Sequence, residues 1–166
     1  PPERGLIGLL SLLPQVVDAV RIPVLAAGGI ADGRGMAAAL LLGAQGVQLG
    51  TAFLACEESA ASAVQRASLF QPQASDTVLT RVFSGRLARG IRNQFVERLQ
   101  AVEDRLPGYP LLNSLTAELK RAAVAQQRPE LMSLWSGQSA GLLRHRTAAA
   151  LLTALEEQAQ TLLGGL

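Results

Sequence analysis

The sequence is poor in the residues from which metal centres and disulfides are built. Its 166 residues include one cysteine, Cys56, and one histidine, His145. A single cysteine cannot form a disulfide within the chain or a cysteine-based zinc site. Because there is only one histidine as well, a metal site made from histidine and cysteine is nearly excluded. We therefore expect no bound metal.

Long apolar runs and a strong charge of one sign are also missing. No run reaches the roughly 18–20 apolar residues of a membrane span, and no secretory signal is visible at the start. Lysine and arginine number 15 against 13 for aspartate and glutamate, which gives a net charge of +2, and the arginines are scattered. These absences predict a cytoplasmic protein with neither a membrane nor a nucleic acid as partner.

The composition favours a packed α or α/β protein. Hydrophobic residues make up 49% of the chain and charged residues 17%, which is ample apolar content for a core and argues against disorder. The length is that of about one domain.

The first third of the chain has the alternating helices and strands that are typical of a parallel α/β sheet. Apolar residues at spacings of three and four predict a helix over 10–20, with Ser11 capping its start and Pro14 in its first turn. The apolar run 22–27 predicts a strand buried on both faces. Asp32 is expected to cap a helix that extends over 36–42 and stops at Gly43, and 46–49 predicts a second strand. This order is typical of a βαβ unit.

Beyond Thr51 helices and strands no longer alternate, and helices predominate. The pattern predicts helices over 57–69, 91–102, 114–127 and 146–163, a strand over 77–83 and a basic loop over 84–90. We therefore divide the chain into an α/β part, residues 1–70, and a mostly helical part, residues 71–166, which would serve as a substrate or cap subdomain and closing helix.

Each of the two predicted strands is followed by a glycine-rich loop. Gly28-Gly29 follows the first strand and Gly50-Thr51 the second. The carboxyl ends of neighbouring parallel strands lie at one edge of a sheet, so both loops would face one site. A glycine has no Cβ, so a phosphate group can come close to its backbone. The start of a helix after the loop would supply N–H donors to that phosphate. The alternative is that these glycines only form tight turns.

The residues around these loops are distinctive. Residues 22–33 read IPVLAAGGIADG and residues 42–54 read LGAQGVQLGTAFL. Together they resemble the nitronate monooxygenase family, formerly called 2-nitropropane dioxygenase. Residues 83–93 (FSGRLARGIRN) and 134–138 (LWSGQ) are similar to segments of that family's C-terminal portion. Leu87 stands where the family often has proline. This departure affects the stiffness of the loop and not its chemistry.

The resemblance implies a TIM barrel, a (β/α)8 fold, that binds FMN and oxidises alkyl nitronates with O2. Matched residue by residue, Gly29 and the run Gln48, Leu49, Gly50 and Thr51 would bind the phosphate and ribityl parts of FMN. Gly28 would allow the cofactor to come close to the backbone.

Much of such a barrel has no counterpart in this sequence. A (β/α)8 barrel needs about 200–250 residues, whereas only two barrel-like strands are predicted here. The resemblance places the catalytic histidine in a Gly-His segment upstream of residue 22, and the sequence has no such segment. We therefore expect the C-terminal part of a longer protein, with the last two strands of the barrel, no catalytic residue of its own and no activity alone.

Two other functions stay open at this point. One is a flavin-type enoyl-acyl-carrier-protein reductase, which would share the barrel and the phosphate loops but use a nicotinamide donor. The other is a non-catalytic half-barrel that binds a phosphate ligand or a complementary partner chain. The expected partners are a nitronate-type substrate with O2, and either the missing N-terminal barrel half or a second copy of this chain.

Several further residues could carry chemistry, but structural roles are the simpler interpretation. Cys56 is expected to be a small packed residue whose pKa a neighbouring carboxylate raises. Glu57 and Glu58 are expected to favour the start of the following helix through its dipole. His145 is expected to be a solvated or capping residue, and Tyr109 and Trp135 are expected to be core or interface anchors and not substrate stackers. Two roles stay open for three arginines, contact with an anionic substrate or the flavin and a solvated helix entry: Arg86, Arg89 and Arg92.

Overall fold

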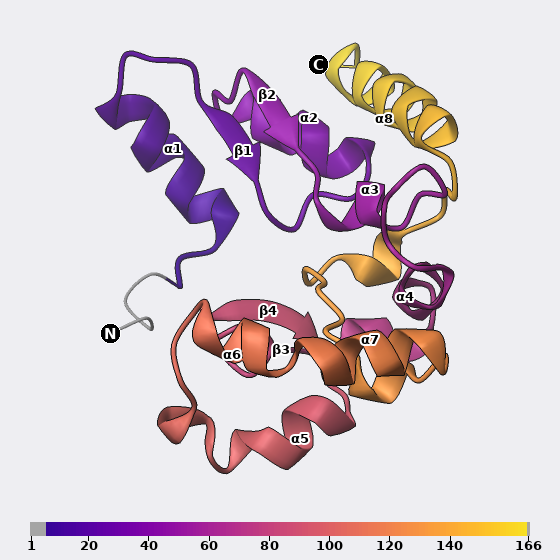
Figure 1. Ribbon diagram of the computed structural model, residues 1–166. Coiled ribbons are helices and arrows are strands. Elements are labelled where there is room, and N and C mark those ends of the chain that lie inside the picture. Colours follow the sequence, from indigo (N-terminus) through magenta and orange to yellow (C-terminus); the bar gives the residue numbers. More distant parts are fainter. Residues whose placement is uncertain (1–5, 166) are drawn as a thin grey trace. The chain divides into compact units, whose positions relative to one another are not determined.

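The computed structural model describes residues 6–165, which form two compact units (Figure 1). The first unit combines the described residues up to Ser59 with those from Leu142 onwards. The second unit is Ala60–Gly141. These units divide the chain at other points than the predicted parts 1–70 and 71–166, because the last helix joins the first unit. The functional division of the chain stays a prediction.

The first unit confirms the predicted order of helix, strand, helix and strand. Its two strands are parallel, and their register pairs Leu25 with Gly46 and Ala27 with Gln48. Both strands are shorter than predicted. The elements of this unit are α1 (Leu9–Ala19), β1 (Leu25–Ala27), α2 (Gly33–Leu41), β2 (Gly46–Gln48), α3 (Thr51–Leu54) and α8 (Ala148–Leu163).

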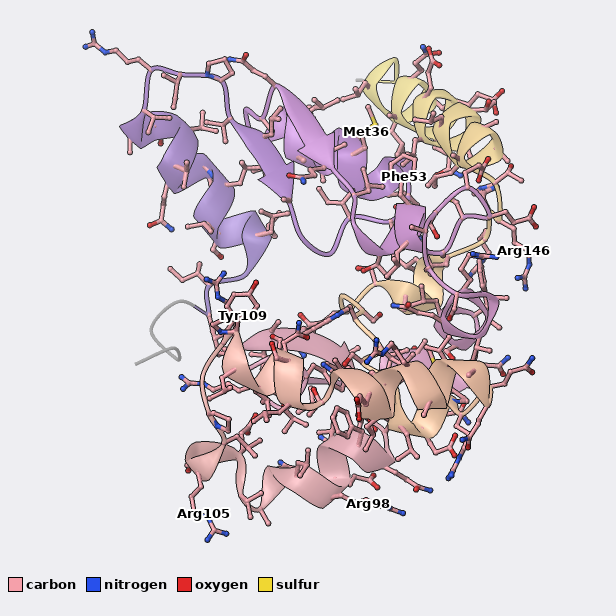
Figure 2. The ribbon with its side chains drawn as sticks, viewed as in Figure 1. Met36, Phe53, Arg98, Arg105, Tyr109 and Arg146 are labelled. Atoms are coloured by element: carbon pink, nitrogen blue, oxygen red, sulfur yellow. The ribbon has the colours of Figure 1, made fainter. Side chains whose placement is uncertain are left out.

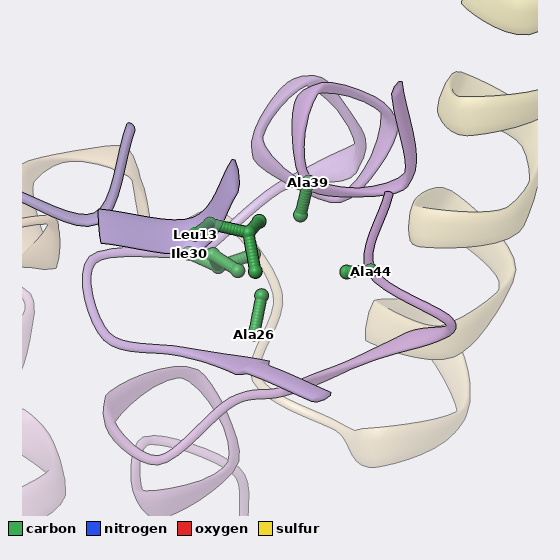
Figure 3. Close-up of a cluster of buried hydrophobic side chains, with 5 residues drawn as sticks. All are labelled: Leu13, Ala26, Ile30, Ala39 and Ala44. Carbon is green, nitrogen blue, oxygen red and sulfur yellow. The ribbon is translucent and has the colours of Figure 1, made fainter. Parts of the chain in front are cut away.

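The core of the first unit lies on one face of this small sheet. Figure 3 shows the buried side chains that form it: Leu13, Ala26, Ile30, Ala39 and Ala44. In β1 only Ala26 is buried, and Leu25 is 63% exposed. The prediction that this strand is buried on both faces is therefore wrong for the described residues, since α1 and α2 supply apolar side chains to a single face.

Helix α1 begins earlier than the sequence pattern predicted. Gly8 occupies the N-cap position without a side-chain hydrogen bond, and Ser11 lies within the helix. Pro14 stands in the interior and not in the first turn, where its lack of an N–H removes one hydrogen bond. The predicted cap at Ser11 is wrong because the apolar stripe extends back to Leu9, which packs against the core.

Helix α2 is capped as predicted and packs closely on α8. The Asp32 carboxylate accepts hydrogen bonds from the amides of Arg34 and Gly35, and Gly43, at φ +94°, follows the last turn. A Cβ on Gly33 would lie 2.3 Å from the Cβ of Gln158. Only glycine therefore allows this approach between the two helices.

The second unit is mostly helical with one antiparallel strand pair. Strand β3 (Thr77–Thr80) pairs with β4 (Ala88–Ile91), and Phe83 and Phe95 stack in its core with ring centroids 6.1 Å apart. Its helices are α4 (Ala63–Leu69), η2 (Pro72–Ser75), α5 (Gln94–Gln100), η3 (Glu103–Arg105), α6 (Leu111–Leu115), α7 (Ala117–Ala125) and η4 (Pro129–Leu131), and η5 (Ala140–Leu142) lies at the boundary.

Two predictions for this region are wrong. The helix predicted over 57–69 is present only as α4, because Ser62 accepts a hydrogen bond from the Gln65 amide and caps the helix there. The loop predicted over 84–90 contains most of β4, whose Gly90 also forms a β-bridge with Trp135. A Cβ on Gly90 would lie 2.5 Å from the Leu134 carbonyl oxygen. This glycine thus allows close backbone approach inside a strand.

Candidate functional site

The two glycine loops lie at the same edge of the parallel sheet. Strands β1 and β2 end on the paired residues Ala27 and Gln48, so Gly28-Gly29 and Leu49-Gly50 continue the chain from neighbouring strand ends. Gly28 has φ +111° and Gly29 has φ +71°. Residues other than glycine rarely adopt such positive φ values. The register brings together the loops that sequence reasoning singled out.

The space in front of these loops is open. A Cβ built on Gly28 or on Gly50 would meet no other atom within 4 Å, and both residues are exposed. A ligand can therefore approach the backbone of both loops without meeting a side chain at these positions. Such open space is compatible with a phosphate group that contacts the backbone.

The start of α2, by contrast, is already occupied by side chains. Asp32 accepts the Arg34 and Gly35 amides, and the side-chain oxygen of Gln158 accepts the Gly33 amide at 3.0 Å. The expectation that this helix start offers donors to a phosphate is therefore wrong. Burial acts to raise the pKa of Asp32, but hydrogen bonds from Arg34 and Gly35 outweigh it and lower that pKa.

Gly50 and the segment after it line an open cavity of about 320 Å³, together with Ala148. Cys56 on its wall is 1% exposed, and its thiol donates to the Ala52 carbonyl at 3.3 Å. Burial, and next the charge of Glu58, raise the pKa of this thiol, so Cys56 is the packed residue that was expected. The lining comprises Gly50, Phe53 (labelled in Figure 2), Leu54, Cys56, Glu58, Ser59 and Ala148.

Glu58 has a different role from the one predicted. Both of its carboxylate oxygens accept the amide of Ala148 at 3.0 Å, and Ala148 is the first residue of α8. The prediction had assigned Glu57 and Glu58 to the following helix, α4, which Ser62 caps instead. Local patterns could not reveal this contact, because 90 residues separate its two partners.

His145 lies beside a second cavity of the first unit, of about 610 Å³. The cavity wall includes the ion pair between Asp32 and Arg34, whose charged atoms are 2.5 Å apart, and apolar residues of α8. His145 is half-buried.

Three candidate arginines contact groups within the second unit. The Arg86 guanidinium lies 4.4 Å from the centre of the Tyr109 ring, and Arg89 donates to the Thr77 hydroxyl at 3.1 Å. Arg92 forms an ion pair with Asp76 at 3.4 Å.

Trp135 is a core residue, in agreement with the simpler interpretation. It meets Phe83 edge to face, with the ring centroids 5.0 Å apart, and packs against the buried cluster of the second unit. Its neighbours therefore account for its position without a substrate.

Two other kinds of feature are absent from the described residues. Between residues 6 and 165, no group of three or more histidine, cysteine, aspartate or glutamate side chains could hold a metal ion. In the same part of the chain, no helix has both the length and the hydropathy needed to cross a membrane.

Comparison with known proteins identifies the family. A model of the nitronate monooxygenase family matches residues 1–158. A probable nitronate monooxygenase of Staphylococcus saprophyticus is 46% identical over 158 residues, and one of Staphylococcus haemolyticus is 48% identical over 161 residues. These matches cover 95% and 97% of this chain but only 44% and 45% of the relatives.

Solved structures agree with this assignment. A nitroalkane oxidase from Streptomyces ansochromogenes has a TM-score of 0.90 at 40% identity and covers 96% of this chain, with 45% of its own length matched. FabK from Thermotoga maritima has a TM-score of 0.80 at 34% identity and covers 97% of this chain, with 51% of its own length matched.

The fold is α/β, and its structural neighbours include a nitroalkane oxidase and FabK. The chain belongs to the nitronate monooxygenase family. It spans slightly less than half the length of the curated relatives that it matches.

Proposed function

We propose that this chain supplies the phosphate-binding end of an FMN-dependent oxidoreductase that oxidises alkyl nitronates with O2. In this proposal β1 and β2 are the last two strands of a (β/α)8 barrel. The observation that carries it is the pair of glycine loops at one sheet edge, each with open space in front of its backbone. Phosphate sites after the last two strands are common in such barrels.

The residues present suit a cofactor phosphate. Gly28 keeps a positive φ and leaves its Cβ position free, so the ligand can touch the backbone. Gly29 and the run Gln48, Leu49, Gly50 and Thr51 would contact the phosphate and the ribityl chain. FMN, when bound, would supply the capacity to take electrons from the nitronate and pass them to O2.

The proposal assigns no catalytic residue to this chain. The resemblance places the catalytic histidine in a Gly-His segment, whereas the single histidine here stands between Arg144 and Arg146. Residues outside this sequence would supply the base and most of the substrate pocket. We therefore propose that the 166-residue chain alone does not oxidise nitronates.

The experiment uses the full-length protein. Purified protein is stripped of flavin and titrated with FMN and with riboflavin, and O2 consumption is measured with an alkyl nitronate such as propyl-2-nitronate. We expect tighter binding of FMN than of riboflavin, and O2 consumption only with FMN bound. Equal affinity for the two flavins would overturn the phosphate site.

The same preparation separates the alternative functions. A flavin-type enoyl-acyl-carrier-protein reductase would reduce its flavin rapidly with NADH and leave the nitronate unchanged. A non-catalytic protein would bind a phosphate ligand without reacting with either compound. The first function is preferred because the relatives at 46% and 48% identity are named as nitronate monooxygenases.

A further inference from the structure

Helix α8 forms hydrogen bonds with the segment that follows each of the two glycine loops. It contacts both α2 and α3, and in Figure 1 it runs beside α2. Helix α2 follows the loop at Gly28-Gly29, and α3 begins at the loop at Gly50-Thr51. One element therefore connects the two loops through the body of the first unit, independently of the sheet.

The first attachment joins α8 to the start of α2. The Gln158 side-chain oxygen accepts the Gly33 amide at 3.0 Å, and Gly33 lies only four positions after Gly29. The missing Cβ of Gly33 lets the helices meet, because a Cβ there would also lie 2.9 Å from the Ala159 nitrogen. The position of the first loop is thereby tied to the C-terminal half of α8.

The second attachment joins the start of α8 to the segment after α3. Both Glu58 oxygens accept the Ala148 amide at 3.0 Å, and the Glu57 amide donates to the Arg146 carbonyl at 2.8 Å. A carboxylate at a helix N-terminus forms a charge-assisted hydrogen bond and also interacts favourably with the helix dipole. This contact thus fixes the start of α8 against the second loop region.

Helix α3 needs such a support. It has four residues, far fewer than an isolated helix requires for stability. Gly50, Glu58 and Ala148 line the same cavity, so a shift of the α8 start would change the surroundings of Gly50. About 15 Å of helix, at 1.5 Å per residue, separates Ala148 from Gln158. Helix α8 is therefore a rigid connection of fixed length between the two attachments.

We infer that α8 acts as a brace, and that Glu58 and Gln158 are positioning residues that fix the distance between the two phosphate loops. This inference rests on the proposed function, because the ligand between the loops is the phosphate of FMN. Neither side chain touches the cofactor in this account. Each acts through the helix that it anchors.

The test compares FMN with riboflavin in the full-length protein. Flavin is removed, and the dissociation constants of both flavins are measured by fluorescence for wild type, Glu58→Ala, Glu58→Gln and Gln158→Ala. We expect Glu58→Ala to weaken FMN binding about fivefold, the factor that corresponds to the loss of one hydrogen bond. Riboflavin binding should weaken clearly less, because riboflavin keeps the ribityl chain but lacks the phosphate that the two loops would hold together.

Two variants serve as controls. Glu58→Gln keeps an oxygen that can accept the Ala148 amide, so it should restore most of the FMN affinity. Glu57→Ala removes a carboxylate of the same type from the neighbouring exposed position, while the backbone amide that bonds to Arg146 remains. FMN affinity should not change in this second control.

The outcomes separate the inference from the proposed function. If wild type binds FMN no better than riboflavin, the proposed phosphate site is wrong and the brace has no ligand to position. If wild type prefers FMN, but Glu58→Ala weakens both flavins equally or neither of them, the phosphate site stands and the brace is wrong. A selective loss of FMN affinity that Glu58→Gln restores supports the brace.

Discussion

Gly28 and Gly50 are both glycines at the candidate phosphate site, but for different physical reasons. Gly28 has φ +111°, which excludes most side chains on backbone grounds alone. Gly50 has φ −90° and ψ −67°, a conformation open to any residue, and a Cβ there would meet nothing within 4 Å. A requirement for glycine at position 50 would therefore report on a ligand and not on the fold.

This difference makes Gly50→Val an informative change. We expect the variant to fold with a free energy of unfolding within about 1 kcal/mol of wild type, since the site is open and exposed. FMN affinity should fall more than tenfold, because the branched side chain would occupy the space that the phosphate needs. Flavin content after purification and thermal unfolding of the flavin-free protein measure the two effects.

The control is Gly108→Val in the second unit. Gly108 also has no atom within 4 Å of its Cβ position and does not have a positive φ, so the same change is made at an equally open position. Its flavin content should match wild type. Full flavin retention by Gly50→Val would contradict the proposed phosphate site.

At the scale of elements, the start of α2 depends on one carboxylate. Asp32 accepts two backbone amides and pairs with Arg34, and its side chain is 17% exposed. Its pKa is lowered in the folded protein. A carboxyl group whose pKa falls on folding adds stability above its unfolded pKa, and this contribution is lost as the pH falls through the folded pKa.

Asp32→Asn isolates this charge, since asparagine caps helices about as well as aspartate. At pH 7 we expect wild type to be more stable than the variant by up to about 1 kcal/mol, the usual range for a charge at a helix start. The difference should shrink below about pH 4 and vanish once Asp32 is protonated. Urea unfolding of both proteins between pH 3 and pH 7 measures it. A constant difference over this range would contradict the assigned role of the charge.

The elements that the sequence predicted well are those encoded by local signals. Asp32 and Gly43 correctly bound α2, and both strands follow from short apolar runs. Strand β4 was missed because Arg89 and Gly90 are poor strand formers. They are held in the strand by β3 and by the bridge to Trp135, which is distant in sequence. Such tertiary pairing overrides local propensity.

At the scale of the whole molecule, the separation in sequence between two contacting residues decides which parts of the candidate site could be predicted. The glycine loops could be found because each follows its strand directly, and parallel pairing brings the strand ends together. The contacts of Glu58 with Ala148 and of Gly33 with Gln158 could not, since 90 and 125 residues separate the partners. The meeting of the two loops at one sheet edge was therefore predictable, whereas the long-range contacts that we propose to position them required the fold.

The exposed apolar side chains on and near the small sheet indicate how the isolated 166-residue chain should behave in solution. In the part of the chain that the structure describes, β1 pairs only with β2. Leu25 on this strand is 63% exposed, Ile22 just before the strand is 70% exposed, and Leu10 on α1 is 69% exposed. An unpaired strand edge and exposed apolar side chains favour pairing with another chain. We expect the isolated chain to self-associate, and a complementary barrel half to bury these side chains in the full-length protein.

Sedimentation velocity over a range of concentrations measures this association. Leu25→Thr should weaken it, because threonine suits a strand but removes much of the apolar surface. Leu115→Thr is the matched control, since Leu115 is 66% exposed but belongs to the second unit. That variant should associate like wild type. An isolated chain that stays monomeric at every concentration would show that the first unit needs no partner. The interpretation of this chain as the C-terminal part of a larger barrel would then give way to an independent small fold.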